Sequence, residues 1–286
     1  MDQLLLVLVS GIASGAIYGL MGLGLVIVYR ATDVVNFALA SLATIGLYAA
    51  ITFHDNGAAV LVGAVVVTVV AGLLVREVVI RPLGQGRLFA ALVVTMGVAL
   101  IGESVISSVW GTQPKSFPSI VDGTVHAGSL VIPAQSLLTI AVAGVAMGLV
   151  AFLFGRTTTG SAMRAVAESA DTAQVVGINA QRIARLAWAL GLGLGALAAC
   201  LYAPKVGLAP TVLSAPLFRA FAGIFLGGLN SMYGAVVGGL AVGVLENLGA
   251  SYVSASFRDT FVFTFTVLVL LIRPQGLFGT RTFQRV

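Results

Sequence analysis

The residues that could carry chemistry in this chain are few, and most lie in or beside apolar sequence. Glu103 and Glu246 each interrupt an apolar run, whereas His54 and His126 lie between such runs. A carboxylate within a membrane span is costly and faces the protein interior, where it serves structural pairing or a proton relay. A relay needs partners at the same depth, and the apolar runs hold no histidine or lysine. We therefore expect structural pairing, or a place near the membrane interface, for both carboxylates.

Motifs that would give this chain its own enzymatic chemistry are missing from the sequence. It has no Gly-x-x-x-x-Gly-Lys-Ser/Thr phosphate loop and no His-Glu-x-x-His zinc motif. The single cysteine, Cys200, excludes an intrachain disulfide and a cysteine-based metal cluster. The glycine-rich run 191–195 lacks the strand and helix pattern that a dinucleotide site needs. We expect a chain without catalytic activity that itself binds no cofactor or metal ion.

A polar segment at 155–185 stands out because apolar runs flank it on both sides. Within it, small apolar residues alternate with polar ones at helical spacing. The apolar members are Ala162, Met163, Ala165, Val166, Ala173, Val175, Val176 and Ile178, and the polar members are Arg164, Glu168, Asp171 and Gln174. The pattern predicts one short amphipathic helix or a pair of them, ending near Gly177, because glycine favours the position just past a helix end.

Two surfaces could receive this amphipathic segment. A helix lying in the membrane interface carries many basic residues on its polar face, and Arg164 is the single one here before Arg182. A groove on a soluble partner protein fits the pattern better.

The composition predicts an all-α polytopic membrane protein. Of the 286 residues, 59% are hydrophobic and 9% are charged, whereas a soluble domain carries roughly 25% charged residues. Only helices and closed barrels satisfy their backbone in lipid, and the apolar runs lack the alternation of a barrel. The net charge of +5 comes from basic residues at the ends of apolar runs, which argues against a nucleic-acid surface. We expect residues 1–286 to form one integral-membrane domain.

Nine apolar runs divide the chain. They cover residues 4–28, 37–53, 58–75, 88–109, 136–154, 186–202, 217–229, 234–250 and 260–272. A full span takes roughly 17–25 residues, so the 217–229 run is too short, and the last run is expected to begin a few residues earlier. We predict about eight transmembrane helices plus one short re-entrant or broken helix, with the first run retained as a span rather than removed as a signal peptide.

The basic residues predict the orientation. If successive spans alternate, 11 of the 15 basic residues fall on one side, within 29–36, 76–87, 155–185 and 273–286. The other four are Lys115, Lys205, Arg219 and Arg258. Because the cytoplasmic side carries the excess of lysine and arginine, we expect a cytoplasmic 155–185 loop and C-terminus. The N-terminus and the 110–135 loop are then expected outside.

Two places suggest breaks in helices. The cluster 227–231, Gly-Gly-Leu-Asn-Ser, follows the short run, and we expect either a re-entrant or discontinuous helix beside a transport pathway or an ordinary tight turn. Asn36 opens the second run, where it either caps a helix or presents its amide to a substrate. Glu246 could hold asparagine or backbone groups near these breaks. Glycines at four-residue spacing, as at 11, 15 and 19, predict close packing between helices.

Short motifs spread over nearly the whole chain point to a family. They are Asn36-Phe37-Ala38, Arg81-Pro82-Leu83, Gly160-Ser161-Ala162-Met163-Arg164-Ala165, Gly177-Ile178-Asn179, Ala220-Phe221, Leu226-Gly227-Gly228, Tyr233-Gly234-Ala235, Glu246-Asn247 and Arg273-Pro274-Gln275-Gly276-Leu277-Phe278-Gly279. Each motif alone is weak, but together and in this order the sequence resembles the permease subunits of branched-chain amino acid ABC importers of the Liv type.

One departure from the family pattern concerns the substrate. After Asn-Phe-Ala the family usually carries a polar residue, a glycine and often an acidic residue, and here those positions are Leu39, Ala40 and Ser41. The change removes polar groups from an expected pathway helix. It leaves the substrate open between amino acids and the urea, amides or other small solutes that relatives of the family carry.

The resemblance implies a bacterial inner-membrane permease that works with several partners. These are a homologous second permease, two cytoplasmic ABC ATPases that bind ATP and Mg²⁺, and a periplasmic solute-binding protein. It implies ATPase coupling through Gly160, Ala162, Met163, Arg164, Ala165, Glu168, Ala173, Gly177 and Ile178. It implies a substrate pathway near Asn36, Phe37, Gly227, Gly228, Asn230 and Glu246.

Two other classes of protein remain as alternatives from the residues alone. A stand-alone secondary transporter or channel for a small solute would need coupling ions or a filter, and would not need the 155–185 segment. A scaffold or receptor subunit would explain a bundle of helices but not a broken helix.

Overall fold

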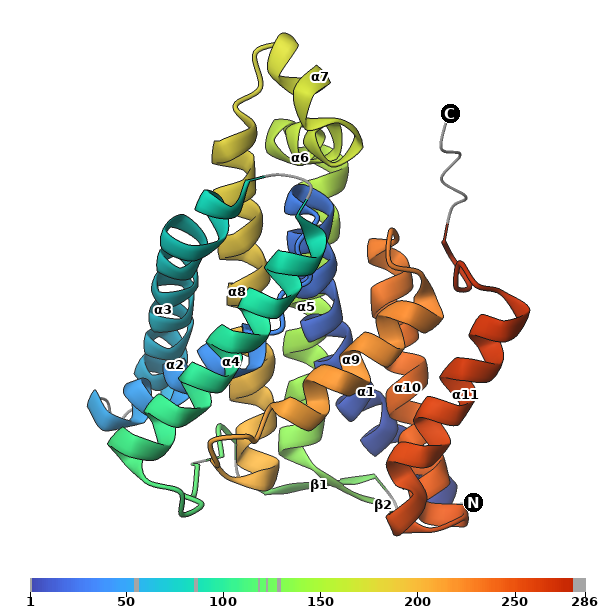
Figure 1. Cartoon of the computed structure of the whole chain (residues 1–286). Helices are drawn as coiled ribbons and strands as arrows, with labels where there is room; N and C mark the ends of the chain where they lie inside the picture. Colours follow the sequence, from blue (N-terminus) through green and yellow to red (C-terminus); the bar gives the residue numbers. More distant parts are fainter. Residues whose placement is uncertain are drawn as a thin grey trace. The chain divides into compact units, whose positions relative to one another are not determined.

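Helices make up nearly all of the chain (Figure 1). The computed structural model describes residues 2–53, 57–84, 87–117, 119–121, 123–127 and 130–279. In this part of the chain, seven helices are long and apolar enough to cross a membrane, and two further apolar helices are shorter. The predicted all-α polytopic membrane class is confirmed.

The chain groups into two compact units. The first unit comprises residues 1–26, 119–144 and 216–286, and the second comprises residues 27–118 and 145–215. Helices α1 (Asp2–Thr32), α5 (Ala134–Arg156) and α9 (Ser214–Gly227) contribute residues to both.

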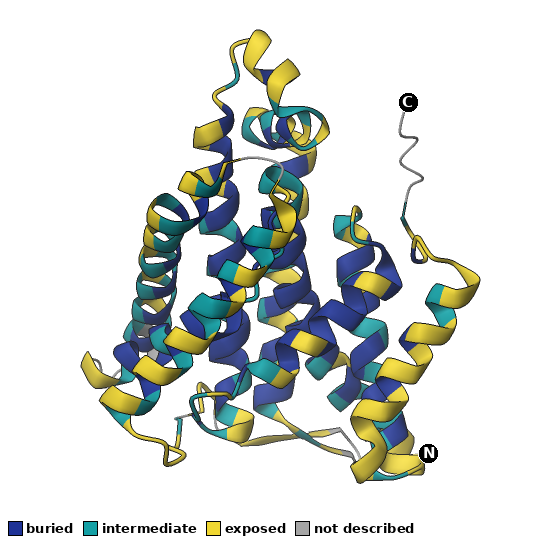
Figure 2. Cartoon of the chain, viewed as in Figure 1, coloured by how far each residue is buried: buried dark blue, intermediate teal, exposed yellow. Residues whose placement is uncertain are grey.

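The second unit is built around α8. Its elements are α2 (Leu39–Phe53), α3 (Gly57–Val75), the π-helical turn η1 (Arg76–Ile80), the 3-10 turn η2 (Arg81–Leu83), α4 (Leu88–Trp110), α6 (Thr158–Glu168), α7 (Ala170–Val175) and α8 (Ala180–Val206). Helix α8 contacts α2, α3, α6 and α7, and α2 also packs on α3 and α4. Buried residues follow most of α8 (Figure 2). The core around its fully buried Trp188 contains Val28, Val34, Ala38, Leu42, Ile80, Ala91 and Leu192.

Helix α2 is shorter than the apolar run, residues 37–53, in which a span was predicted. The run 37–53 was counted as a full span, but the helix has 15 residues and begins at Leu39. At 1.5 Å per residue it is about 22 Å long, which is less than the roughly 30 Å of a hydrocarbon core. It therefore belongs with the shorter apolar helices, because Phe37 and Ala38 at the start of the run form a turn instead of helix.

The first unit is a set of helices in backbone contact. It contains residues 2–26 of α1, residues 216–227 of α9, α10 (Met232–Tyr252), the 3-10 turn η3 (Ala255–Phe257), α11 (Arg258–Ile272) and the strands β1 (Thr124–Ala127) and β2 (Leu130–Pro133). A Cβ atom placed on Gly15 would lie 2.7 Å from the Cα of Leu240, and one on Gly223 would lie 2.8 Å from the amide nitrogen of Gly239. The predicted glycine packing is confirmed: α1 and α9 meet α10 where no larger residue fits.

The segment 110–135, expected to be a loop, contains a short antiparallel hairpin. Strands β1 and β2 pair with Thr124 opposite Pro133 and His126 opposite Val131. Pro133 has no amide hydrogen to donate, which suits its place as the last residue of a strand.

A buried arginine joins four helices of the first unit. Arg219 of α9 donates from Nε and Nη2 to Oδ1 of Asp259 on α11, at 3.0 and 2.7 Å. Its Nη1 lies 3.4 Å from Oε1 of Glu246 on α10, and the Tyr18 hydroxyl of α1 donates to Oε2 of Glu246 at 2.6 Å. Arg219 and Glu246 are 8% and 3% exposed, so this pair has almost completely left solvent.

The two carboxylates inside apolar runs both have structural partners. Glu246 pairs with Arg219, and Glu103 on α4 accepts a hydrogen bond from the Ser214 hydroxyl at 3.1 Å. Arg219 was predicted to lie near one face of the membrane, and its pairing with Glu246 was not foreseen.

Removing one member of the buried pair should destabilise the protein more than removing both charges. Arg219→Met removes the buried cation and leaves the Glu246 carboxylate only the half-exposed Arg258 at 3.7 Å, and loss of a buried partner costs up to about 3–5 kcal/mol. The double variant Arg219→Met/Glu246→Gln removes the uncompensated charge and should recover much of that loss. Thermal unfolding of the purified protein in detergent measures both, and equal melting temperatures for the single and double variants would contradict the pairing.

Candidate functional site

The polar segment folds as the predicted pair of short helices, and each helix start is capped by a side chain. The Thr157 hydroxyl accepts from the amide of Gly160 at the start of α6, and Ser169 accepts from Thr172 at the start of α7. Asn179 accepts from Arg182 at the start of α8. Such caps satisfy amides that a helix start leaves free. The pair of helices ends at Gly177, whose φ of 83° favours glycine, as predicted.

The two helices divide the predicted coupling residues between an inner and an outer face. Gly160, Met163 and Ala173 are buried against the rest of the second unit, while Ala162, Ala165 and Ile178 are half-buried. Arg164, Glu168 and Gly177 are exposed. The buried residues therefore hold the helices in place, and the exposed ones can meet a partner.

The tip of α7 exposes apolar residues that the predicted contact set left out. Val175 and Val176 are 87% and 71% exposed. These two adjacent valines give the tip an apolar surface that a partner could cover. Two consecutive valines just before the glycine are the sequence signal that could have found them.

The turn before α2 contains Asn36, whose side-chain oxygen accepts a hydrogen bond while its side-chain nitrogen has no partner among the described residues. Asn36 is fully buried, and its Oδ1 accepts from the amide of Ala38 at 3.1 Å. Its Nδ2 has no hydrogen-bond partner among the described residues. The Thr95 hydroxyl of α4 donates to the carbonyl of Val35 at 3.0 Å, which satisfies the backbone of the same turn. Asn36 thus accepts from the residue before α2, close to the predicted capping role, and still has amide hydrogens to offer, while the neighbouring Phe37 is half-buried.

The break after α9 is closed by the C-terminal motif. The amides of Leu277 and Phe278 donate to the carbonyls of Leu226 and Gly227 at 2.8 and 2.9 Å. Gly228 follows with φ 110°, and a Cβ atom there would lie 2.6 Å from the amide nitrogen of Gly279. The motifs around 226–228 and 273–279 therefore pack backbone against backbone.

The predicted pathway residues do not all gather at one place. Gly227 and Gly228 lie at the break, and Asn230 is exposed in the turn that follows it. Glu246 lies 14 residues along α10 from its first residue, Met232, which is about 21 Å at 1.5 Å per residue. The idea that Glu246 holds groups near the breaks is therefore wrong, since its partners are Tyr18, Arg219 and Arg258.

Comparison with known proteins decides the family. A family model described as "Branched-chain amino acid transport system / permease component" matches residues 7–272. The chain belongs to this family. The match includes both breaks and the 155–185 segment and ends just before the motif at 273–279.

Named relatives match along nearly the whole permease. The high-affinity branched-chain amino acid transport system permease protein LivH of Escherichia coli K12 is 28% identical, covering 97% of this chain and 96% of the relative. The permease protein BraD of Pseudomonas aeruginosa is also 28% identical, with 98% and 97% covered. A probable permease protein LivH of Methanocaldococcus jannaschii is 27% identical, with 91% and 88% covered.

A solved structure shares the fold. PsaBC from Streptococcus pneumoniae in complex with Fab has a TM-score of 0.50 and 14% sequence identity, covering 94% of this permease and 91% of that chain. At this identity the likeness concerns the fold alone.

Adding one methyl group at Gly228 should disrupt the break. Gly228→Ala forces a Cβ atom into the Gly279 backbone at a φ that suits glycine, a strain worth about 1–3 kcal/mol. Gly144→Ala on α5 is the matched control, because a Cβ atom there meets nothing within 4 Å. Thermal unfolding should show a loss for Gly228→Ala and none for Gly144→Ala. Equal melting temperatures for the two variants would contradict the packing.

Two substitutions separate the possible roles of Asn36. Asn36→Ser keeps an acceptor for the turn and replaces the Nδ2 donor by a hydroxyl on a shorter side chain that already binds the turn, whereas Asn36→Ala removes both. If the free donor faces the solute, both variants should lose uptake per assembled complex. Loss of the turn alone should cost Asn36→Ala about 0.5–2 kcal/mol of stability and leave Asn36→Ser active. We expect the first result, and normal uptake by Asn36→Ser would exclude a pathway role for the amide.

Proposed function

We propose that this permease moves branched-chain amino acids, or a related small polar solute, through the bacterial inner membrane as part of an ATP-driven importer. The proposal rests on the family match over residues 7–272. The structural observation that carries it is the capped α6–α7 pair, which exposes Arg164, Glu168 and two valines on its outer face.

The partners follow from what the chain has and lacks. It has no phosphate-binding loop, so ATP and Mg²⁺ belong to separate ATPase subunits. We infer two such ATPases, a homologous second permease that completes the passage, and a periplasmic binding protein that delivers the solute. The exposed α6–α7 face is the contact for an ATPase groove, in the manner of a helix laid into a groove.

Packing within the second unit connects the proposed ATPase contact on α6 and α7 to the membrane helices. Helices α6 and α7 both pack on α8, and α8 packs on α2 and α3. Met163 and Ala173 are buried on the inner face of the pair, so a movement of the pair is passed to α8. Helix α2 begins next to the Asn36 turn, which brings the free amide donor into the same chain of contacts.

Charge placement supports the orientation in which α6 and α7 are cytoplasmic. Arg30, Arg76, Arg81 and Arg87 line one cavity together with residues 166–171. These basic residues therefore share one end of the second unit with the polar segment. The helix α4 runs from Leu88 at this cavity to Trp110, and its far end holds Lys115 near Tyr48. The excess of arginine at the cavity end supports a cytoplasmic position for that end.

ATP-driven uptake by the assembled transporter tests the proposal. The permease is purified with its ATPase subunits and second permease, placed in liposomes, and supplied with loaded binding protein. Uptake of radiolabelled L-leucine should require ATP and Mg²⁺ and should vanish when the catalytic glutamate of the ATPase is replaced by glutamine. Uptake by the permease alone, driven by an ion gradient without ATPase, would instead show a secondary transporter.

Charge reversal on the outer face of α6 should uncouple the transporter. Arg164→Glu and Glu168→Arg change exposed residues that have no role in the buried packing of the unit. Gln113→Glu, exposed near the opposite end of the second unit, is the control. We expect the two α6 variants to lose ATP-driven uptake at normal membrane levels while the control keeps it. Normal uptake by both α6 variants would remove this face from the coupling contact.

A further inference from the structure

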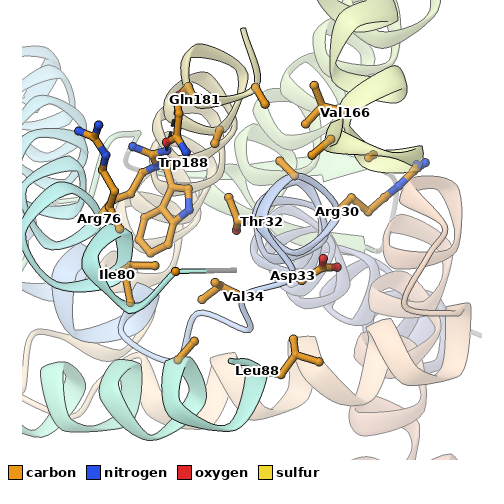
Figure 3. Close-up of a pocket in the computed structure, with 18 of the residues that line it drawn as sticks. Arg30, Thr32, Asp33, Val34, Arg76, Ile80, Leu88, Val166, Gln181 and Trp188 are labelled. Carbon is orange, nitrogen blue, oxygen red and sulfur yellow. Dashed lines mark hydrogen bonds between the residues drawn. The ribbon is translucent and has the colours of Figure 1, made fainter. Parts of the chain in front are cut away.

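A cavity of about 320 Å³ lies at the end of the second unit beside α6 and α7 (Figure 3). This volume falls in the range of small-molecule sites. Its walls come from the end of α1 and the turn after it, from η1, η2 and the start of α4, and from the 166–171 and 180–188 segments. All of these elements belong to the second unit.

The cavity presents charges of both signs. Arg30 and Arg87 lie on its wall together with the carboxylates of Asp33, Glu168 and Asp171. Among the described residues, none of these five has an ion-pair partner, whereas Arg76 and Arg81 at the same cavity pair with Glu77. Free arginines beside free carboxylates suit a ligand that carries one positive and one negative group.

One wall of the cavity offers a buried donor beside apolar side chains. Trp188 is fully buried, and its Nε1 has no hydrogen-bond partner among the described residues. Figure 3 shows its indole between Ile80 and Arg76 on one side and Thr32 and Val34 on the other. An unsatisfied N–H next to apolar groups matches a ligand with a carboxylate and an apolar side chain.

One residue at the cavity, Asp33, has an unusual backbone conformation. Asp33 has φ 54°, the only positive φ of a non-glycine residue in the described chain. Its amide donates to the Tyr29 carbonyl at 2.7 Å, which ends α1 and places the aspartate at the cavity. Aspartate tolerates this conformation better than most residues, and such outliers gather at ligand sites.

We propose that this cavity binds the transported solute as a zwitterionic amino acid on the cytoplasmic side, and that bound solute slows further transport. The ammonium group binds among Asp33 and Asp171, and the carboxylate binds among Arg30, Arg87 and the Trp188 N–H. The apolar side chain rests on Val34 and Ile80. The inference rests on the proposed function, which supplies the amino acid as the solute and the cytoplasm as the side from which it binds.

The position of the cavity explains the effect on transport. Residues 166–171 belong to α6, the start of α7 and the residue between them, which is the pair whose outer face is proposed to meet the ATPase. A solute that bridges these residues to Asp33 and Trp188 restrains the pair against the membrane helices. Because a ligand favours the state that it binds more tightly, solute on this side favours the restrained state.

Anionic lipid is the competing occupant for a basic pocket at the end of membrane helices. A phosphate headgroup would be attracted by the arginines but repelled by Asp33, Glu168 and Asp171 on the same wall. A zwitterion satisfies both sets of charges, so the residues favour the amino acid.

Tryptophan fluorescence tests the binding directly. The chain has two tryptophans, and Trp110→Phe leaves Trp188 as the reporter at the cavity. In the assembled complex, L-leucine should change this fluorescence in a saturable way, measured as the difference from the same complex carrying Trp188→Phe as well. Leucinamide lacks the carboxylate and 4-methylpentanoate lacks the ammonium group, so each should bind about tenfold more weakly or worse. Inorganic phosphate and phosphatidylglycerol vesicles probe the anion alternative, and a response to them as strong as that to L-leucine would overturn the proposal.

Matched variants separate the cavity from the rest of the transport pathway. Asp33→Asn keeps a residue that tolerates the positive φ and removes one charge, and Arg30→Gln removes another. Arg156→Gln is the control, because Arg156 lies in the last turn of α5 as Arg30 does in α1 but is not at the cavity. Asp33→Asn and Arg30→Gln should weaken the L-leucine response about tenfold, and Arg156→Gln should leave it unchanged. An unchanged response in both cavity variants would contradict the site.

Uptake by the same preparations keeps this inference distinct from the proposed function. L-leucine loaded on the α6–α7 side should lower the initial rate of ATP-driven uptake, and Asp33→Asn should relieve that inhibition. If ATP-driven uptake occurs but Trp188 does not respond to L-leucine, this inference is wrong and the proposed function stands. If Trp188 responds but uptake is independent of ATP, the cavity stands and the proposed function is wrong.

Discussion

Lipid offers no hydrogen-bond partner to a polypeptide backbone, and two apolar helices of this permease are too short to cross the bilayer. Every helix end leaves amides or carbonyls unpaired, and at membrane depth those groups must find partners within protein. At the end of α9 the partners are the amides of Leu277 and Phe278. At the start of α2 they are the side chains of Asn36 and Thr95. The positions of the C-terminal segment and of the Asn36 turn before α2 follow from this constraint.

The same constraint gives a physical reason for several motifs. Close approach of two backbones leaves no room for side chains, which is why Gly228 faces the Gln275–Gly279 segment. The buried Arg219 is satisfied by carboxylates on α10 and α11, so the helix that ends at this break is also fixed along its length. Two separate sets of contacts therefore fix α9: backbone contacts at its end and ion pairs along its length.

Composition and spacing predicted the class of protein, the polar helix pair and its end at Gly177, because these depend on local patterns. They also predicted that 217–229 is too short to span and that glycines pack helices together. The start of α2 at Leu39 was missed, since Phe37 and Ala38 continue the apolar run and only Asn36 before them suggested a break. The partners of Arg219 were missed because Glu246 and Asp259 lie 27 and 40 residues away on other helices. The cavity around Trp188 joins five separate segments, and no spacing rule brings such residues together.

The central claim is that backbone hydrogen bonds from the C-terminal motif close the break after α9. Hydrogen–deuterium exchange of the assembled transporter in lipid nanodiscs measures these bonds at the amides of Leu277 and Phe278. The account predicts exchange many times slower than in a free peptide of residues 273–279, because both amides are bonded and packed against α9. Exchange of these two amides at the rate of the free peptide would contradict it.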